Sequence, residues 1–181
     1  ILADEMGLGK TVQLLALLAS RKLRSSPPAL IVCPASLVAN WEREAHKFVP
    51  GFRVAAPAGH DRADMFKEVN EYDLVILSYA AARLSADKLK HCNFSFLVLD
   101  EAQHIKNPGS SNAKNCKSIA AAHRIVLSGT PLENSPEDLW SIMDFLQPGM
   151  LGTLPAFRRA YSNLREDPAL QQDLAARIGP F

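Results

Sequence analysis

Two adjacent acids, Asp100 and Glu101, have residue types and a position that suit hydrolytic chemistry. They directly follow the apolar run 96–99, which predicts a strand that is buried on both faces. Open α/β sheets bind ligands at the carboxyl ends of their strands, which is where this pair falls. In a nucleotide-hydrolysing site, Asp100 would hold a Mg²⁺ ion that bridges the phosphates, while Glu101 would polarise the attacking water. An acidic pair by itself is more typical of a solvated helix start, so this interpretation depends on a second motif.

A glycine-containing loop far upstream supplies that second motif. Gly7, Gly9, Lys10 and Thr11 lead into an apolar run with helical spacing. The N–H groups and the dipole at a helix N-terminus attract phosphate, and glycines let the backbone approach it closely. Lys10 would reach the terminal phosphates, and the Thr11 hydroxyl would take a Mg²⁺ position. The strict phosphate-loop pattern has glycine where this chain has Asp4, so a plain helix start with a lysine is the alternative.

Short apolar runs alternate with longer amphipathic ones around these two motifs. This alternation predicts an α/β fold with a doubly wound, mostly parallel sheet, because strands with continuous apolar sequence are covered by helices on both faces. In the helix expected at 37–48, Leu37, Trp41, Ala45 and Phe48 recur at helical spacing and should form one buried face. The expected strands cover residues 1–3, 29–33, 73–77, 94–99 and 124–128, and the expected helices cover residues 11–24, 37–48 and 111–121.

The pattern changes at Pro136, where a proline and two acids open a helix in the positions that the helix dipole favours. Residues 136–146, 154–164 and 168–178 are expected to be helices with no strand between them. We therefore predict a nucleotide-binding lobe over residues 1–150 and a helical extension over residues 151–181. The first residue is Ile1 rather than methionine, so we expect the chain to be a piece of a longer protein.

Composition narrows the class of protein. The 181 residues suit a single domain, and 48% hydrophobic residues suffice for a substantial core. The apolar runs stop well short of the ~18 residues that a membrane span needs, and no secretory leader precedes them. The net charge of +1 gives no electrostatic indication of nucleic-acid binding, so any DNA contact must come from a local surface. Three widely spaced cysteines support neither a disulfide framework nor a zinc site, and a reducing compartment fits best.

Three further segments follow expected strands, but none is decisive by its residue types alone. The first is equally consistent with a helix cap, the second with an ordinary strand end, and the third with a plain turn. They are residues 34–36, 78–79 and 128–131.

Taken in order, these segments resemble the first RecA-like lobe of superfamily-two helicases, and among these the Swi/Snf-type double-stranded DNA translocases. The resemblance covers essentially the whole chain. Its most specific parts are residues 4–11 and 127–134, and further matches lie at residues 32–37, 40–41, 73–79, 99–107, 138–146 and 148–152.

The resemblance implies that ATP is the nucleotide and that Mg²⁺ accompanies it. It implies that Lys10, Asp100 and Glu101 are catalytic, that Thr11 and Asp100 hold the metal, and that Gly7, Gly9, Lys10 and Thr11 bind the nucleotide.

The resemblance also implies a DNA contact and a coupling segment. Residues near the backbone of double-stranded DNA would be Ala35, Ser36, Ser78 and Tyr79. The segment Ser128, Gly129 and Thr130 would couple the nucleotide state to this contact. Contacts to the DNA backbone carry little sequence information, which fits a motor that tracks any sequence.

The family's adenine-reading glutamine segment lies upstream of the phosphate loop, and its second RecA-like lobe carries an arginine finger. The resemblance therefore implies that this lobe works with a second lobe of the same chain and is not active alone. A DNA-bound protein complex is a further possible partner, and no membrane is expected. The Ala-rich helices favour a bacterial source and hence a cytoplasmic, nucleoid-associated location, whereas a eukaryotic source would make it nuclear.

Two alternatives stay open from the sequence. One is a lobe of another superfamily-two motor, such as a restriction-enzyme translocase or an RNA helicase. The other is a catalytically dead scaffold that keeps the fold for partner binding, although the intact Lys10, Asp100 and Glu101 disfavour it.

Overall fold

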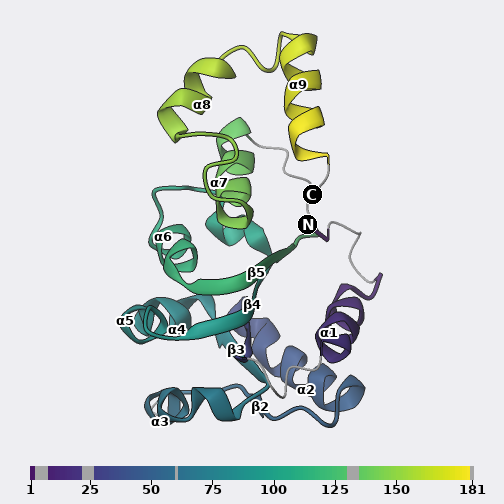
Figure 1. Cartoon of the computed structure of the whole chain (residues 1–181), viewed down its shortest axis with the longest axis vertical. Coiled ribbons are helices and arrows are strands. Elements are labelled where there is room, and N and C mark those ends of the chain that lie inside the picture. The colour runs from purple at the N-terminus through teal and green to yellow at the C-terminus, as the bar shows by residue number, and fades with distance from the viewer. Residues whose placement is uncertain (3–7, 22–26, 60, 130–134, 180–181) are drawn as a thin grey trace.

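The computed structural model describes residues 1–2, 8–21, 27–59, 61–129 and 135–179. Its strands are β1 (Ala29–Cys33), β2 (Val54–Ala55), β3 (Leu74–Ser78), β4 (Asn93–Asp100) and β5 (Ala120–Leu127). They form one sheet in the order β2-β3-β1-β4-β5, and every pairing in it is parallel (Figure 1). The predicted α/β fold with a doubly wound parallel sheet is confirmed. The central strand β1 is buried along its whole length, as its continuous apolar sequence predicts.

The strand expected at residues 1–3 is seen only as a single bridge. Leu2 pairs in parallel with Leu127, and its N–H donates to the Val126 carbonyl over 2.8 Å. The Ser128 N–H donates to the Leu2 carbonyl over 3.2 Å. The beginning of the chain therefore lies along the outer edge of β5, while Ala3 lies outside the described residues.

Helices cover both faces of the sheet, as Figure 1 shows. On one face lie α1 (Lys10–Ser20) and α2 (Val38–Phe48), which pack against each other. On the other lie α4 (Tyr79–Leu84), α5 (Ala86–Leu89) and α6 (Ser111–Ser118), with α3 (Asp61–Lys67) beside β2. Short 3-10 helices occupy Ala35–Leu37, Val69–Glu71 and Ala102–Ile105.

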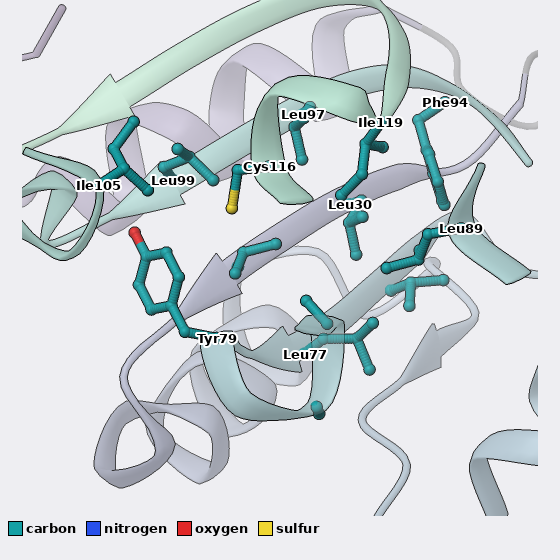
Figure 2. Packing of buried hydrophobic residues seen from close by; sticks show 14 of the residues in the cluster. Leu30, Leu77, Tyr79, Leu89, Phe94, Leu97, Leu99, Ile105, Cys116 and Ile119 are labelled. Carbon is teal, nitrogen blue, oxygen red and sulfur yellow. The ribbon is translucent and has the colours of Figure 1, made fainter. Parts of the chain in front are cut away.

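The two faces carry separate apolar cores. The core under α1 and α2 includes Leu15, Ile31 and Trp41. The core under α4 to α6 includes Leu30, Leu97 and Cys116, and Figure 2 shows its side chains converging between the strands and these helices. Successive residues of β1, such as Leu30 and Ile31, enter opposite cores because strand side chains alternate between faces.

A third apolar cluster lies in the helical tail, which consists of α7 (Pro136–Leu146), α8 (Leu154–Ala160) and α9 (Pro168–Ile178). Helix α7 belongs to two cores, because Ile142 and Phe145 pack under α6 while Trp140 and Met143 face the tail. The boundary predicted at residue 150 stays a prediction. Among the described residues, no helix combines the length and apolarity needed to cross a bilayer.

Several element predictions need correction. The helix expected to run to residue 121 ends at Ser118, because the next residues turn into β5. Phe48 does not complete a buried face of α2, since it is 42% exposed, and Leu37 is only half-buried. Helix α8 ends at Ala160 rather than at residue 164. Strand β2 and helices α3, α4 and α5 were not predicted.

Candidate nucleotide-binding site

The described part of the glycine loop leads directly into α1 through Gly9. Gly9 is the N-cap of α1 with φ 77° and ψ 27°, a left-handed conformation that glycine adopts without strain. A glycine cannot provide the side-chain oxygen that usually accepts a hydrogen bond from the first turn, so an external anion is a suitable acceptor there. The loop is held from α1, because the Gln13 amide donates to the Leu8 carbonyl over 3.2 Å. Gly7 lies outside the described residues.

The acidic pair lies at the carboxyl end of β4, as predicted. Asp100 is the last residue of the strand, and Glu101 follows it with φ 54°. Glu101 is the one non-glycine residue with positive φ in the described part of the chain. Such backbone strain concentrates at functional sites. The Gln103 amide donates to Glu101 Oε2 over 2.9 Å and thereby limits the motion of this carboxylate.

Hydrogen bonds hold Asp100 at three atoms. The Trp41 indole N–H donates to Oδ2 over 2.8 Å, and the Glu101 N–H donates to Oδ1 over 3.0 Å. The Tyr79 hydroxyl donates to the Asp100 main-chain carbonyl over 3.0 Å. Burial raises the pKa of Asp100 above its usual value, and the charge of Glu101 adds to this, while the Trp41 hydrogen bond and the charge of Lys10 act in the opposite direction.

Loop and acids meet in one cavity of about 590 Å³ at the carboxyl edge of the sheet. Lys10 also interacts electrostatically with Asp100 across it. Helix α2 supplies one face of this cavity, a contribution that was not predicted. From the loop and the strand ends, the cavity is lined by Gly9, Lys10, Thr11, Val12, Asp100, Glu101 and Leu127, and from α2 and the turn before it by Leu37, Asn40, Trp41, Arg43, Glu44, Lys47 and Phe48.

The residues at this cavity fit a Mg²⁺ ion held together with a nucleotide. Mg²⁺ is usually bound through one or two carboxylates plus substrate phosphates, rather than by an all-protein cage. Asp100 provides such a carboxylate, and Thr11 lines the same cavity. Each carboxylate oxygen of Asp100 accepts one hydrogen bond, which leaves lone pairs for a cation.

The four residues predicted to lie near DNA are brought to the same sheet edge, at the ends of the neighbouring strands β1 and β3. Ala35 and Ser36 are exposed in the 3-10 helix that precedes α2. The Ser78 hydroxyl instead caps α4 by accepting the Ala81 N–H over 3.1 Å. Tyr79 is only 5% exposed, which favours an internal role for its side chain. The DNA role of these positions stays a prediction.

The Tyr79 ring lies in the core under α4 and α6, with its hydroxyl end toward Ile105 in Figure 2. It stacks on His104 with 4.6 Å between ring centroids. In the predicted coupling segment, Ser128 is buried and Gly129 is half-buried, whereas Thr130 lies outside the described residues.

A family model described as the SNF2-related domain matches residues 1–181. The chain belongs to the SNF2-related family. The SNF2-related lobe is 39% identical to a solved structure described as the Sulfolobus solfataricus SWI2/SNF2 ATPase core in complex with dsDNA, with a TM-score of 0.91 over 99% of this chain and 38% of that one. This match confirms the RecA-like fold and the resemblance to Swi/Snf-type proteins.

Curated relatives of the lobe come from eukaryotes and bacteria. It is 37% identical over 180 residues to the human DNA excision repair protein ERCC-6. The matched region is 90% of this chain and 12% of that protein. It is 38% identical over 165 residues to the putative ATP-dependent helicase/translocase YwqA of Bacillus subtilis. The matched region is 88% of this chain and 18% of that protein. The lobe thus spans less than a fifth of these relatives.

Proposed function

We propose that this SNF2-related lobe binds ATP together with Mg²⁺ and serves as the first lobe of an ATP-driven motor that moves along double-stranded DNA. The observation that carries the proposal is the single cavity in which Gly9, Lys10 and Thr11 meet Asp100 and Glu101. A phosphate cradle and two acids at one sheet edge are the parts that nucleotide hydrolysis needs. The solved SWI2/SNF2 ATPase core in complex with dsDNA supports the choice of DNA as partner.

The residues divide the work as follows. The start of α1 receives the phosphates, and the Lys10 ammonium places a positive charge beside them. Thr11 and Asp100 would hold the metal, which supplies positive charge to the developing transition state when bound. Glu101 accepts a proton from the attacking water or orients it, and the hydrogen bond from Gln103 keeps its carboxylate in place.

DNA would contact the edge formed by the ends of β1 and β3. Ala35 and Ser36 are exposed there, and small residues with a hydroxyl and backbone N–H groups suit contacts with phosphate oxygens. The second RecA-like lobe would complete the site with an arginine, and residues 151–181 would lead toward it. The length of the solved core, of which this chain covers 38%, leaves room for such a lobe.

The test compares Lys10→Ala and Glu101→Gln in the two-lobed protein. Lys10→Ala should weaken ATP binding because the phosphates lose a charge partner. Glu101→Gln should bind ATP nearly normally but lose roughly 10²–10⁴-fold in turnover, because only proton transfer is removed. Fluorescent-nucleotide titration and steady-state ATPase measure the two effects. Lys114→Ala, which removes an exposed lysine from α6, is the control and should change neither.

The same ATPase assay separates the alternatives. Stimulation by double-stranded DNA supports the proposed motor, whereas stimulation by RNA alone would identify another superfamily-two motor. Absent turnover with intact nucleotide binding would identify a scaffold. Equal loss of nucleotide affinity in both variants would show that Glu101 has a structural role only.

A further inference from the structure

Trp41 reaches the acidic pair from a distant part of the chain. It lies in α2, is 1% exposed, and donates its indole N–H to Asp100 Oδ2 over 2.8 Å, across a separation of 59 residues. Since the indole nitrogen can only donate, its partner must be an acceptor such as a carboxylate. A buried indole N–H needs an acceptor, and for Trp41 this acceptor is a carboxylate at the candidate site rather than a backbone carbonyl.

The bond completes a set that leaves the Asp100 carboxylate little freedom. Rotation of this carboxylate would break either the Trp41 bond to Oδ2 or the Glu101 N–H bond to Oδ1. The Tyr79 hydroxyl fixes the main chain at the same residue. These hydrogen-bond donors come from different elements. Trp41 lies in α2, which follows β1, while Tyr79 begins α4, which follows β3.

From this geometry we infer that Trp41 is a positioning residue, which orients the Asp100 carboxylate for the divalent cation. The inference rests on the proposed nucleotide function of the cavity. Residues that hydrogen-bond to metal ligands fix their orientation, and their loss typically lowers metal affinity by roughly 10–100-fold. Without the indole N–H, Asp100 rotates or binds water, and the cation loses its best-placed ligand. The packing of α2 against the sheet would remain.

The test measures the affinity of the two-lobed protein for a fluorescent ATP analogue, first in EDTA and then across a Mg²⁺ titration. Trp41→Phe removes the N–H and keeps an aromatic ring. Its affinity in EDTA should match that of the unmodified protein, while the Mg²⁺ concentration at half-maximal effect should rise roughly 10–100-fold. The ATPase midpoint in Mg²⁺ should rise in parallel.

The chain offers a matched control in Trp140. It is 8% exposed and donates its N–H to the Gly152 carbonyl over 3.1 Å, in the helical tail. Trp140→Phe thus also removes one buried indole hydrogen bond, and it should leave the Mg²⁺ midpoint unchanged. If Trp41→Phe fails to fold, benzothienylalanine at position 41 replaces it, since this residue keeps the shape of indole and has sulfur in place of N–H.

Asp100→Asn separates failure of the inference from failure of the proposed function. In an Asp100→Asn background, Trp41→Phe should have no further effect on nucleotide affinity at saturating Mg²⁺, because the two residues act as one unit. If Mg²⁺ does not strengthen nucleotide binding in the unmodified protein, the proposed function fails. If Mg²⁺ does so and Asp100→Asn abolishes the gain, yet Trp41→Phe behaves like Trp140→Phe, only the role of Trp41 is overturned.

Discussion

At the residue scale, the backbone of Glu101 is strained at the position for which we propose a catalytic carboxylate. Its φ of 54° lies in a region that side chains with a Cβ rarely occupy, at a cost of about 1 kcal/mol or more. The chain keeps glutamate there although glycine would fit more easily. A requirement for a carboxylate in the cavity therefore accounts for glutamate at position 101, whereas the backbone turn would favour glycine.

Glu101→Gly should consequently give a more stable fold than Glu101→Ala, by about 1 kcal/mol in the free energy of unfolding, because only glycine relieves the strain. Both variants should lose turnover. Denaturant unfolding of the two variants measures the difference. The opposite sign is expected for Ala80→Gly at an exposed position of α4, where glycine weakens the helix. If the Glu101 variants are equally stable, the strain is not there.

Some contacts of the candidate site follow from the sequence, and others do not. The placement of Asp100, Glu101, Lys10 and Thr11 at one sheet edge was predictable, because it follows from local loop and strand-end patterns. Their roles stay predictions. The bond from Trp41 to Asp100 was not predictable, because it depends on which strands become neighbours. Helical spacing placed Trp41 on a buried face correctly but gave no indication of a polar partner.

At the element scale, Arg124 joins two helices to the sheet. From β5, its guanidinium donates to the Lys117 and Ile119 carbonyls at the end of α6, over 3.3 Å and 3.0 Å. It also donates to the Phe145 carbonyl in the last turn of α7 over 2.8 Å. Carbonyls at helix ends lack partners within the helix, so one side chain satisfies both ends.

Arg124→Met should therefore lower the free energy of unfolding by about 2–4 kcal/mol, because partly buried carbonyls lose charged donors. Arg124→Lys should recover little, since an ammonium lacks the planar fork that spans three acceptors. Arg83→Met changes an exposed arginine of α4 and should cost less than about 0.5 kcal/mol. Thermal and denaturant unfolding provide the comparison, and equal losses at both arginines would contradict the joining role.

The same region explains the main error in element prediction. Residues 120–122 are three alanines, which favour helix by propensity, yet Ala120 and Ala121 pair with Asn93 and Phe94 of β4. Pairing along β4 outweighs a local preference of a few tenths of a kcal/mol per residue. Strand β2 was missed for a different reason, because its two residues are too few to show a period.

At the scale of the whole molecule, the proposed function requires an arginine from a second lobe. The arginine finger of phosphoryl-transfer enzymes is worth roughly 10³–10⁵ in rate, or about 4–7 kcal/mol at ~1.4 kcal/mol per decade. Arg43 lines the cavity, but its guanidinium donates to the Asn40 side chain within α2. Arg158 is paired with Glu137 in the tail.

A polypeptide of these 181 residues alone should therefore fold but show almost no ATP hydrolysis, with or without double-stranded DNA. Circular dichroism and steady-state ATPase, set beside the two-lobed protein, provide the measurement. A turnover rate within tenfold of that of the two-lobed protein would show that one lobe suffices and would contradict the two-lobed mechanism.

The strand order also has a consequence for synthesis on the ribosome. Ala29 of the central strand β1 pairs with Leu74 of β3 and with Phe96 of β4, which are translated only later. The nearer of these partners follows by roughly 45 residues, which at roughly 5–20 residues per second is a delay of about 2–9 s. Throughout that delay, the most apolar strand of the lobe has no neighbour on either side. The nascent chain is then most exposed to aggregation, and a chaperone that covers emerging apolar segments would have its clearest target at residues 29–33.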